Sequence, residues 1–256
     1  MDLTMSTNVL LTERDCTLLK ALYDNTVMTY GQIKMQVFPE VKKTTAINRL
    51  TKLLKVGLIS RQRVARIRLG NDPHAIGVLY QITKSGIQWL IRRYPLVTFR
   101  PEPVRIHFYT LEHDLLVVDL MAQQKRESPG VEIVNGRLWE GGTNANGLVP
   151  DLILKKPNSN ALTAIELELN VKSEKRYREL ILKYRMASQF EKVIYFVGHE
   201  SIQATIMRTI LGRPLHPQEK PEIGKFEFRS FHFGPPIATQ NGNDNRAIEK
   251  IPEVNL

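Results

Sequence analysis

Apolar residues recur at helical spacing in three segments of the first part of the chain. The first helix is expected to begin at Thr12, which is placed to cap it together with Asp15. A second, short helix is expected after a cap at Thr29 and should end before Pro39, because proline disfavours helix in the residue that precedes it. The third helix is expected from Thr44 or Thr45 to Val56, with its apolar residues in one stripe.

After residue 57 the pattern changes to the alternation that is typical of strands. Two strands are expected over 58–69 and 77–83, separated by a turn at 70–73, so the segment predicts a β-hairpin. A further helix is expected over 84–94, starting from Thr83. Three helices, a hairpin and a helix follow one another in the order of a winged helix-turn-helix domain, in which the hairpin is the wing.

The rest of the chain alternates between helical and strand-like segments. Helices are expected over 108–127, 173–190 and 201–211, and strands near 131–139, 148–154, 162–169, 192–198 and 225–233. Prolines in 95–106 indicate a linker, and the scarcity of apolar residues in 234–256 predicts a flexible tail. The sequence therefore predicts an α/β (α+β) protein with a winged helix-turn-helix domain over 1–94 and a second domain over 107–233.

The positive charge of the chain is concentrated in its first part. Net charge is +10, and residues 1–107 hold 17 Lys and Arg against 7 Asp and Glu, whereas residues 108–256 hold 19 of each. A polyanion is the expected partner, and nucleic acid is favoured over a membrane surface because no amphipathic apolar face accompanies the charge. Generic solubilising charge is the alternative.

Several classes of protein are disfavoured by composition. No apolar run approaches the roughly 18 residues of a membrane span, and the start of the chain lacks the pattern of a signal peptide. A single cysteine, Cys16, excludes an intrachain disulfide and a metal cluster of several cysteines. These features predict a cytoplasmic protein with no membrane span.

A helix that enters the major groove of DNA needs exposed polar residues in its N-terminal half and an apolar stripe that docks it on its domain. The third predicted helix has both. The candidates for base or phosphate contacts on and before this helix are Lys42, Lys43, Thr44, Thr45, Asn48, Arg49 and Lys52. The hairpin adds arginines that would follow the backbone or enter the minor groove: Arg61, Arg63, Arg66 and Arg68. A charged face on a winged helix that binds protein would give the same pattern.

Three acidic residues are the candidate chemistry of the second domain. Glu166 and Glu168 alternate with aliphatic residues, so both should point to one face of a strand. Asp151 follows Pro150 in the preceding strand-like run, and it reaches the same face if the two strands pair. Converging carboxylates are costly unless a divalent cation neutralises them or water solvates them. An edge hairpin with a solvated acidic face is the alternative.

The helix expected after these acids carries basic and aromatic residues that would hold DNA phosphates, among them Arg176. Lys172, just before this helix, would stabilise negative charge. Tyr177 is a candidate for contact with the scissile phosphate, and packing against the domain is the alternative for it.

This arrangement resembles the active site of the PD-(D/E)xK nuclease superfamily, in which an acid after a proline and an acid on the next strand hold Mg²⁺. Pro150, Asp151 and Glu166 match that pattern, but the usual lysine position is Glu168, and Lys172 is the candidate for the missing cation. The resemblance implies a restriction-endonuclease-like fold over 107–233. It also implies catalytic residues Asp151, Glu166, Glu168, Lys172 and Tyr177, with Mg²⁺ (or Mn²⁺) held by Asp151, Glu166 and Glu168.

Further motifs make the resemblance closer. They are Leu111-Glu112-His113-Asp114-Leu115, Trp139-Glu140, Ile165-Glu166-Leu167-Glu168, Lys172-Ser173 and Arg176-Tyr177. With the winged helix-turn-helix before them, they resemble the replication-relaxation family, and within it relaxases of the MOB-C type, over roughly residues 10 to 233. Glu112 and His113 are expected to be structural or to support the ligands, because a lone histidine on an amphipathic helix is more often packed than a ligand.

Three functions are compatible with these features. The leading hypothesis is a metal-dependent, site-specific DNA nickase, or relaxase, that acts on double-stranded DNA at an origin of transfer, as a possible homodimer and with other relaxosome or coupling proteins as partners. The second is a non-catalytic replication protein, relaxosome accessory factor or repressor with a degenerate nuclease fold, which Glu168 in the lysine position favours. The third is an endonuclease of a defence or transposition system.

Overall fold

The computed structural model describes residues 10–64, 77–139, 147–157, 159–212 and 223–231. Within these ranges the protein is a mixed α/β structure with seven α-helices and two β-sheets. Arg66 and Arg68 of the expected wing, and the expected tail 234–256, lie outside the described residues.

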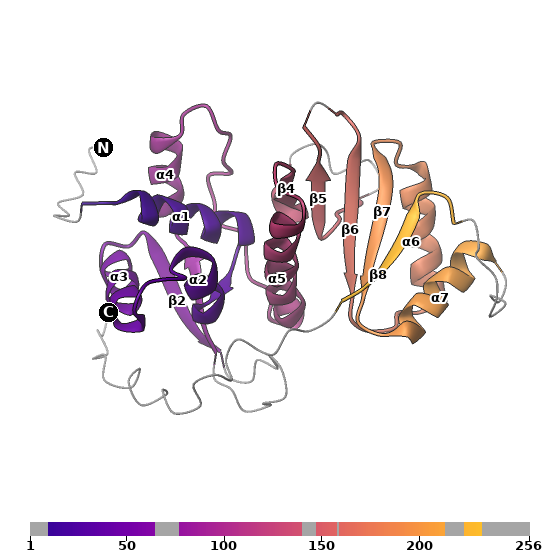
Figure 1. Ribbon diagram of the computed structural model, residues 1–256, viewed down its shortest axis with the longest axis horizontal. Helices are drawn as coiled ribbons and strands as arrows, with labels where there is room; N and C mark the ends of the chain where they lie inside the picture. The colour runs from indigo at the N-terminus through magenta and orange to yellow at the C-terminus, as the bar shows by residue number, and fades with distance from the viewer. Residues whose placement is uncertain (1–9, 65–76, 140–146, 158, 213–222, 232–256) are drawn as a thin grey trace.

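The amino-terminal half combines four helices with a small sheet (Figure 1). Its elements are α1 (Glu13–Asn25), β1 (Met28–Thr29), α2 (Tyr30–Val37), α3 (Lys43–Lys55), β2 (Ile59–Val64), β3 (Gly77–Ile82) and α4 (Lys84–Arg93). The strands form an antiparallel sheet in the order β1-β3-β2. The helices are confirmed where the hydrophobic spacing predicts them, and so is the pairing of the two hairpin strands. The two-residue strand β1 was not expected.

Local side-chain signals account for the starts of three of these helices. Before α1, the Asp15 carboxylate accepts hydrogen bonds from the backbone N–H and hydroxyl of Thr12, both at 2.7 Å. At the start of α2, the N–H of Thr29 donates to Oε1 of Gln32 at 3.0 Å, and the N–H of Gln32 donates to the Thr29 hydroxyl at 3.2 Å. Thr83 accepts the N–H of Gly86 at the start of α4. The caps read from the sequence at Thr12, Thr29 and Thr83 are therefore confirmed.

The carboxy-terminal half is built on a five-stranded sheet in the order β4-β5-β6-β7-β8. Its strands are β4 (Glu132–Asn135), β5 (Leu152–Lys155), β6 (Leu162–Glu168), β7 (Phe190–Val197) and β8 (Phe226–Ser230). The first three strands pair antiparallel, and β6, β7 and β8 run parallel. The strand expected over 131–139 ends at Asn135, whose side chain accepts the N–H of Arg137 and starts the 3-10 turn η2 (Gly136–Leu138).

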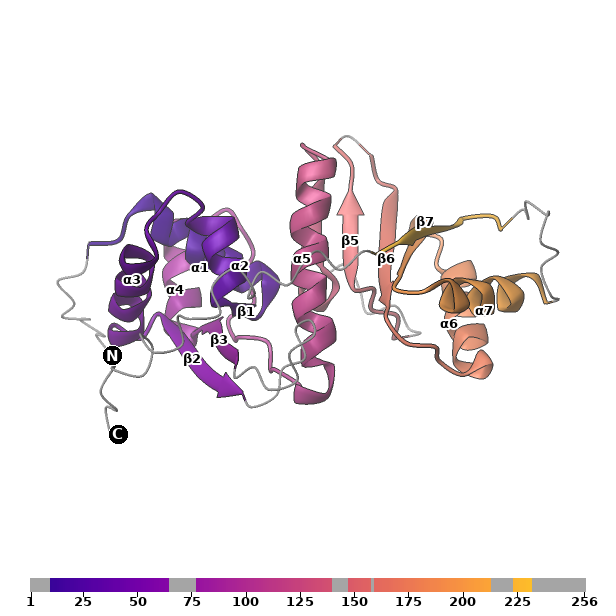
Figure 2. The same ribbon diagram turned by 60° about the horizontal axis from the view of Figure 1, so that its bottom comes forward.

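Helix α5 (Leu111–Glu127) stands between the two halves, and both views show it there (Figures 1 and 2). Val118 belongs to the apolar core of the amino-terminal half, while Val117, Leu120 and Met121 pack on the five-stranded sheet. The opposite face of that sheet is covered by α6 (Glu174–Met186) and α7 (Glu200–Leu211). No helix in the described ranges is both long and apolar enough to cross a membrane.

The segment 95–106, expected as a linker, packs along the amino-terminal half. Phe99 is buried against Tyr23 in an edge-to-face contact with the ring centroids 5.0 Å apart. The N–H of Arg100 donates to the Tyr23 hydroxyl at 2.7 Å, and Gln81 donates to the carbonyl of Val104. These contacts hold Arg100 in a fixed place where the two halves meet.

Candidate active site

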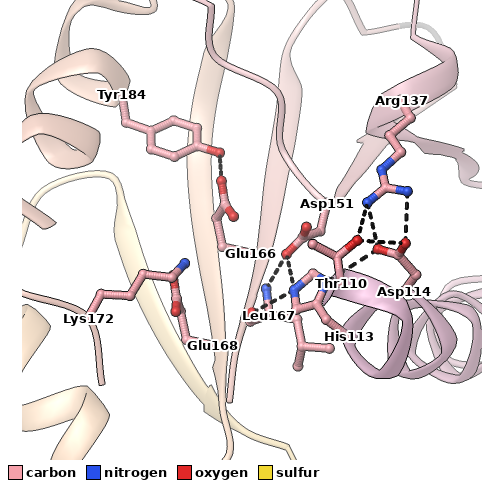
Figure 3. Close-up of polar contacts among 10 residues, drawn as sticks. All are labelled: Thr110, His113, Asp114, Arg137, Asp151, Glu166, Leu167, Glu168, Lys172 and Tyr184. Carbon is pink, nitrogen blue, oxygen red and sulfur yellow. Dashed lines mark hydrogen bonds and ion pairs between the residues drawn. The ribbon is translucent and has the colours of Figure 1, made fainter. Parts of the chain in front are cut away.

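Strand pairing brings Asp151 and Glu166 together. Leu152 of β5 is paired with Ile165 of β6, so Asp151, just before β5, lies opposite Glu166. The backbone N–H of Asp151 donates to the carbonyl of Ile165 at 3.1 Å, which fixes this register. The expected pairing of the two strands is confirmed, and it places both acids where the pairing of β5 with β6 ends (Figure 3).

The two acids of β6 are buried on the face that α6 covers. Glu166 is 7% exposed and Glu168 only 1%, and β6 lies inside the sheet between β5 and β7. The hydroxyl of Tyr184 donates to Oε1 of Glu166, and Nζ of Lys172 lies 2.5 Å from Oε1 of Glu168 (Figure 3). The predicted alternation is confirmed by the other face, where Ile165 and Leu167 pack in the core beside α5. The alternative of an edge hairpin with a solvated acidic face is wrong.

Asp151 is held by both backbone and side-chain donors. Its Oδ2 accepts the N–H of Leu167 at 2.8 Å and lies 3.2 Å from Nε2 of His113. The pairing of β5 with β6 ends at Leu152, so no further residue of β5 offers a backbone carbonyl to the N–H of Leu167. The Asp151 carboxylate accepts this N–H instead. Asp151 therefore extends the hydrogen bonding between the two strands by one bond, and its carboxylate lies near Glu166.

His113 of α5 lies between two carboxylates. Its Nε2 contacts Asp151 and is 3.1 Å from the carbonyl of Leu167, and its Nδ1 is 3.7 Å from Asp114. Burial lowers the pKa of His113, but the hydrogen bonds to Asp114 and Asp151 outweigh this and raise the pKa to about 10. His113 is therefore an imidazolium at neutral pH, and it orients Asp151, in line with the supporting role expected for it.

A second polar group, which the sequence does not reveal, fixes the end of α5 that faces the site. Arg137 of η2 donates to both carboxylate oxygens of Asp114, at 2.8 and 2.6 Å, and to the hydroxyl of Thr110 at 3.3 Å (Figure 3). A two-pronged guanidinium–carboxylate pair of this kind is directional as well as strong. Arg137 and Asp114 are 23 residues apart, and no spacing rule connects them.

The site has an excess of buried negative charge. The pKa of Glu166 is raised well above its usual value, first by burial and then by the charge of Asp151, although the hydrogen bond from Tyr184 opposes this. Burial also raises the pKa of Glu168, and Lys172 opposes the shift. A bound cation would relieve such repulsion.

The residues present fit a hard divalent cation only in part. Among the described residues, no group of three or more His, Cys, Asp or Glu side chains is arranged to hold a metal ion. Asp151 and Glu166 are nevertheless carboxylates on neighbouring strands, and Mg²⁺ commonly takes only one or two protein carboxylates and keeps several waters. These two acids are the ligands that the structure offers, while Glu168 is engaged by Lys172.

The other residues predicted after β6 take different places. Lys172 is partly exposed and keeps its ammonium beside the acids, and Arg176 lies exposed on α6. Tyr177 is fully buried: its hydroxyl accepts the N–H of Lys172 at 3.1 Å and donates to the carbonyl of Asn170. Tyr177 is therefore packed in the core, as in the alternative given for it, and is not placed to contact a scissile phosphate. Its two hydrogen bonds fix the backbone between β6 and α6.

The residues predicted to read DNA are distributed over α3 and β2. The exposed ones are Lys42, Thr44, Thr45, Asn48, Lys52, Arg61 and Arg63. Lys43 is half-buried. Arg49 points inward, because its guanidinium contacts both carboxylate oxygens of Asp15 and the carbonyl of Leu10. In this structure Arg49 ties α3 to α1 instead of facing a groove of DNA.

Gly136 allows a close approach of the backbone just before Asp151. A Cβ atom added at this position would overlap the carbonyl oxygen and carbon of Pro150, the residue before Asp151. We expect Gly136→Ala to push the start of β5 away and to destabilise the fold by about 1–3 kcal/mol, as overpacking does. Urea denaturation measures the loss. Gly130→Ala is the comparison without overlap: nothing lies within 4 Å of a Cβ there, so its cost comes only from the positive φ of this glycine. A loss of stability in Gly136→Ala no larger than that in Gly130→Ala, or no loss at all, would contradict the prediction.

Comparisons with known proteins leave the function to be argued from the site. No family model, no curated protein and no solved structure matches this chain.

Proposed function

We propose that the protein is a metal-dependent, site-specific DNA nickase, of the relaxase type, that acts at an origin of transfer in the mobilisation of a plasmid or a mobile element. The observation that carries the proposal is the pairing of β5 with β6, which sets Asp151 opposite Glu166 with the ammonium of Lys172 close to the same strand. An acid after a proline beside an acid on the next strand is the arrangement that a PD-(D/E)xK nuclease requires.

Each side chain of the site has a distinct part in this proposal. Asp151 and Glu166 hold Mg²⁺ or Mn²⁺, and His113 orients Asp151 by contact with its Oδ2. When bound, the metal polarises the phosphodiester and lowers the pKa of water. Lys172, kept in place by Glu168, stabilises the negative charge that develops on the phosphate. Tyr184 keeps the buried carboxylate of Glu166 in a fixed rotamer through its hydrogen bond.

The amino-terminal half would select the DNA. All of the net charge of +10 lies before residue 108, and the exposed polar residues of α3 and β2 form its basic surface. The order of helices and strands supports a winged helix-turn-helix in which α3 enters the major groove and the hairpin follows the backbone. This half binds a duplex target, and α5, which packs on both halves, connects it to the candidate cleavage site.

A second function is favoured by the way the acids are engaged. Glu168 is paired with Lys172 and Glu166 accepts the hydroxyl of Tyr184, so buried charge is partly compensated without any metal. A DNA-binding replication protein, relaxosome accessory factor or repressor would need no more than this. The two functions differ in cleavage and not in binding.

Incubation with supercoiled plasmid distinguishes these functions. We expect plasmids that carry the DNA flanking the gene of this protein to become open-circular with Mg²⁺ or Mn²⁺, and to stay supercoiled with EDTA. A plasmid without that DNA is the control for site specificity. Linear product as the main species would point to an endonuclease that cuts both strands, and binding without cleavage under every metal would favour the non-catalytic function.

A further inference from the structure

A cavity of about 390 Å³ lies where the segment after α4 meets η2 and the residues before β5. Arg100, Arg105, His107, Arg137 and Trp139 are among the residues that line it. A smaller cavity of about 240 Å³ is lined by Asp151 and shares Arg137 with the larger one. The larger cavity therefore borders the candidate cleavage site, and its size is that of a pocket for a small molecule.

Three guanidinium groups line the larger cavity, and one of them is neutralised. Arg137 is neutralised by its two-pronged pair with Asp114. Arg100 donates one N–H to the carbonyl of Arg137 at 2.6 Å, and neither it nor the exposed Arg105 forms an ion pair with a carboxylate in the described part of the chain. Guanidinium groups in such a wall suit the planar recognition of phosphate oxygens.

Aromatic side chains accompany these arginines. Trp139 lines the cavity and packs on Phe190, with the ring centroids 5.7 Å apart. The 3-10 turn η1 (Phe108–Thr110) exposes Phe108 at 55% and Tyr109 completely. Phe108 and Tyr109 do not line the cavity themselves, but their sequence neighbours His107 and Thr110 do. Exposed aromatic rings near arginines that have no carboxylate partner are the combination that binds unpaired bases by stacking and their phosphates by charge.

We propose that this cavity and the turn η1 bind unpaired nucleotides of the DNA strand next to the phosphodiester that is cut. The phosphates contact Arg100 and Arg105, and the bases stack on Tyr109, Phe108 and Trp139. Bases inside a duplex are already stacked and paired, so they reach such rings only after leaving the helix. The inference rests on the proposed function, because it assigns the substrate strand of the same site: a duplex target that opens locally beside Asp151.

Fluorescence anisotropy on the full chain tests this assignment. The probe is fluorescein-labelled oligothymidylate, alone or annealed to oligodeoxyadenylate, in EDTA so that no cleavage occurs. We expect Tyr109→Ala to weaken single-strand binding about fivefold or more, because base stacking is lost, and Tyr109→Phe to bind as wild type does. Arg105→Ala should reduce the slope of log K against log salt by about 0.7, the loss of one phosphate contact. Duplex binding should stay unchanged in all three variants.

Arg208→Ala is the matched control, because this arginine is exposed on α7 and does not line the cavity. Unchanged single-strand binding in Tyr109→Ala and Arg105→Ala overturns the inference, and so does equal weakening of single-strand and duplex binding. Competition by oligouridylate as strong as that by oligothymidylate overturns the assignment to DNA. Because binding is measured without metal, a wild type that binds the single strand but never nicks plasmid contradicts the proposed function and leaves this site standing.

Discussion

Asp151→Asn and Glu166→Gln are each expected to reduce plasmid nicking by about 100-fold or more, while the affinity for duplex DNA stays that of the wild type. Each change removes one negative charge that would hold the metal. The folds of the variants are preserved, because the Asn carbonyl can still accept the N–H of Leu167 and the Gln carbonyl can still accept the hydroxyl of Tyr184. The readouts are the rate of open-circular product and, separately, a DNA-binding isotherm.

The amides are more informative here than alanine. Alanine at 151 would leave the N–H of Leu167 without its acceptor, and loss of activity could then follow from loss of structure. Glu132→Gln on the same sheet removes an equal charge from an exposed position of β4, and it should nick as wild type does. Full nicking by both Asp151→Asn and Glu166→Gln would remove these acids from the mechanism and sink the assignment of the site.

Much of the fold follows from local signals. Thr12, Thr29 and Thr83 are recognisable caps, and the spacing of apolar residues locates the helices that begin there. Strand β6 is also predicted by a local pattern, because its acids and aliphatic residues alternate with the period of a strand. Two-residue β1 has no such pattern, and it exists only because β3 lies beside it.

The environment of the candidate site is not readable in this way. The alternating pattern assigns Glu166 and Glu168 to one face of the strand, but it does not tell whether that face is exposed to water or covered by α6. The contacts that decide the matter join distant positions: Tyr184 with Glu166, Arg137 with Asp114, and His113 with Asp151. Such contacts depend on how helices pack on the sheet, and sequence spacing carries no information about that.

The position of α5 also changes how the two halves are understood. A break in composition at 95–106 indicates a linker, yet Phe99 is buried and α5 packs on both halves. Gln32 of α2 reinforces this contact by donating to the carbonyl of Leu115 and to Asp119. The helix that presents His113 to the candidate site therefore also packs on the amino-terminal half, through α2 and its apolar core.

Arg49→Ala is expected to lower the free energy of unfolding by about 3 kcal/mol at neutral pH. Asp15 is fully buried, and Arg49, only 22% exposed, supplies two of its donors. Removing the arginine leaves a buried carboxylate that only Thr12 still binds. Urea denaturation followed by circular dichroism measures the change. Lys20→Ala, which breaks the more exposed pair with Asp24 on the same helix, should cost less than about 1 kcal/mol.

The difference in free energy of unfolding between wild type and Arg49→Ala should become smaller at low pH. Burial raises the pKa of Asp15, but the hydrogen bonds from Arg49 and Thr12 outweigh it and lower the pKa below its usual value. A depressed folded pKa gives stability that is complete above the unfolded pKa, about 3.9, and is lost as pH falls through the folded value. In Arg49→Ala burial dominates, so the folded pKa of Asp15 rises and acid relieves the unpaired charge. The gap in stability between the two proteins should therefore narrow from pH 7 to pH 4. A gap that stays constant would mean that Arg49 stabilises α3 by packing alone, and not through the charge of Asp15.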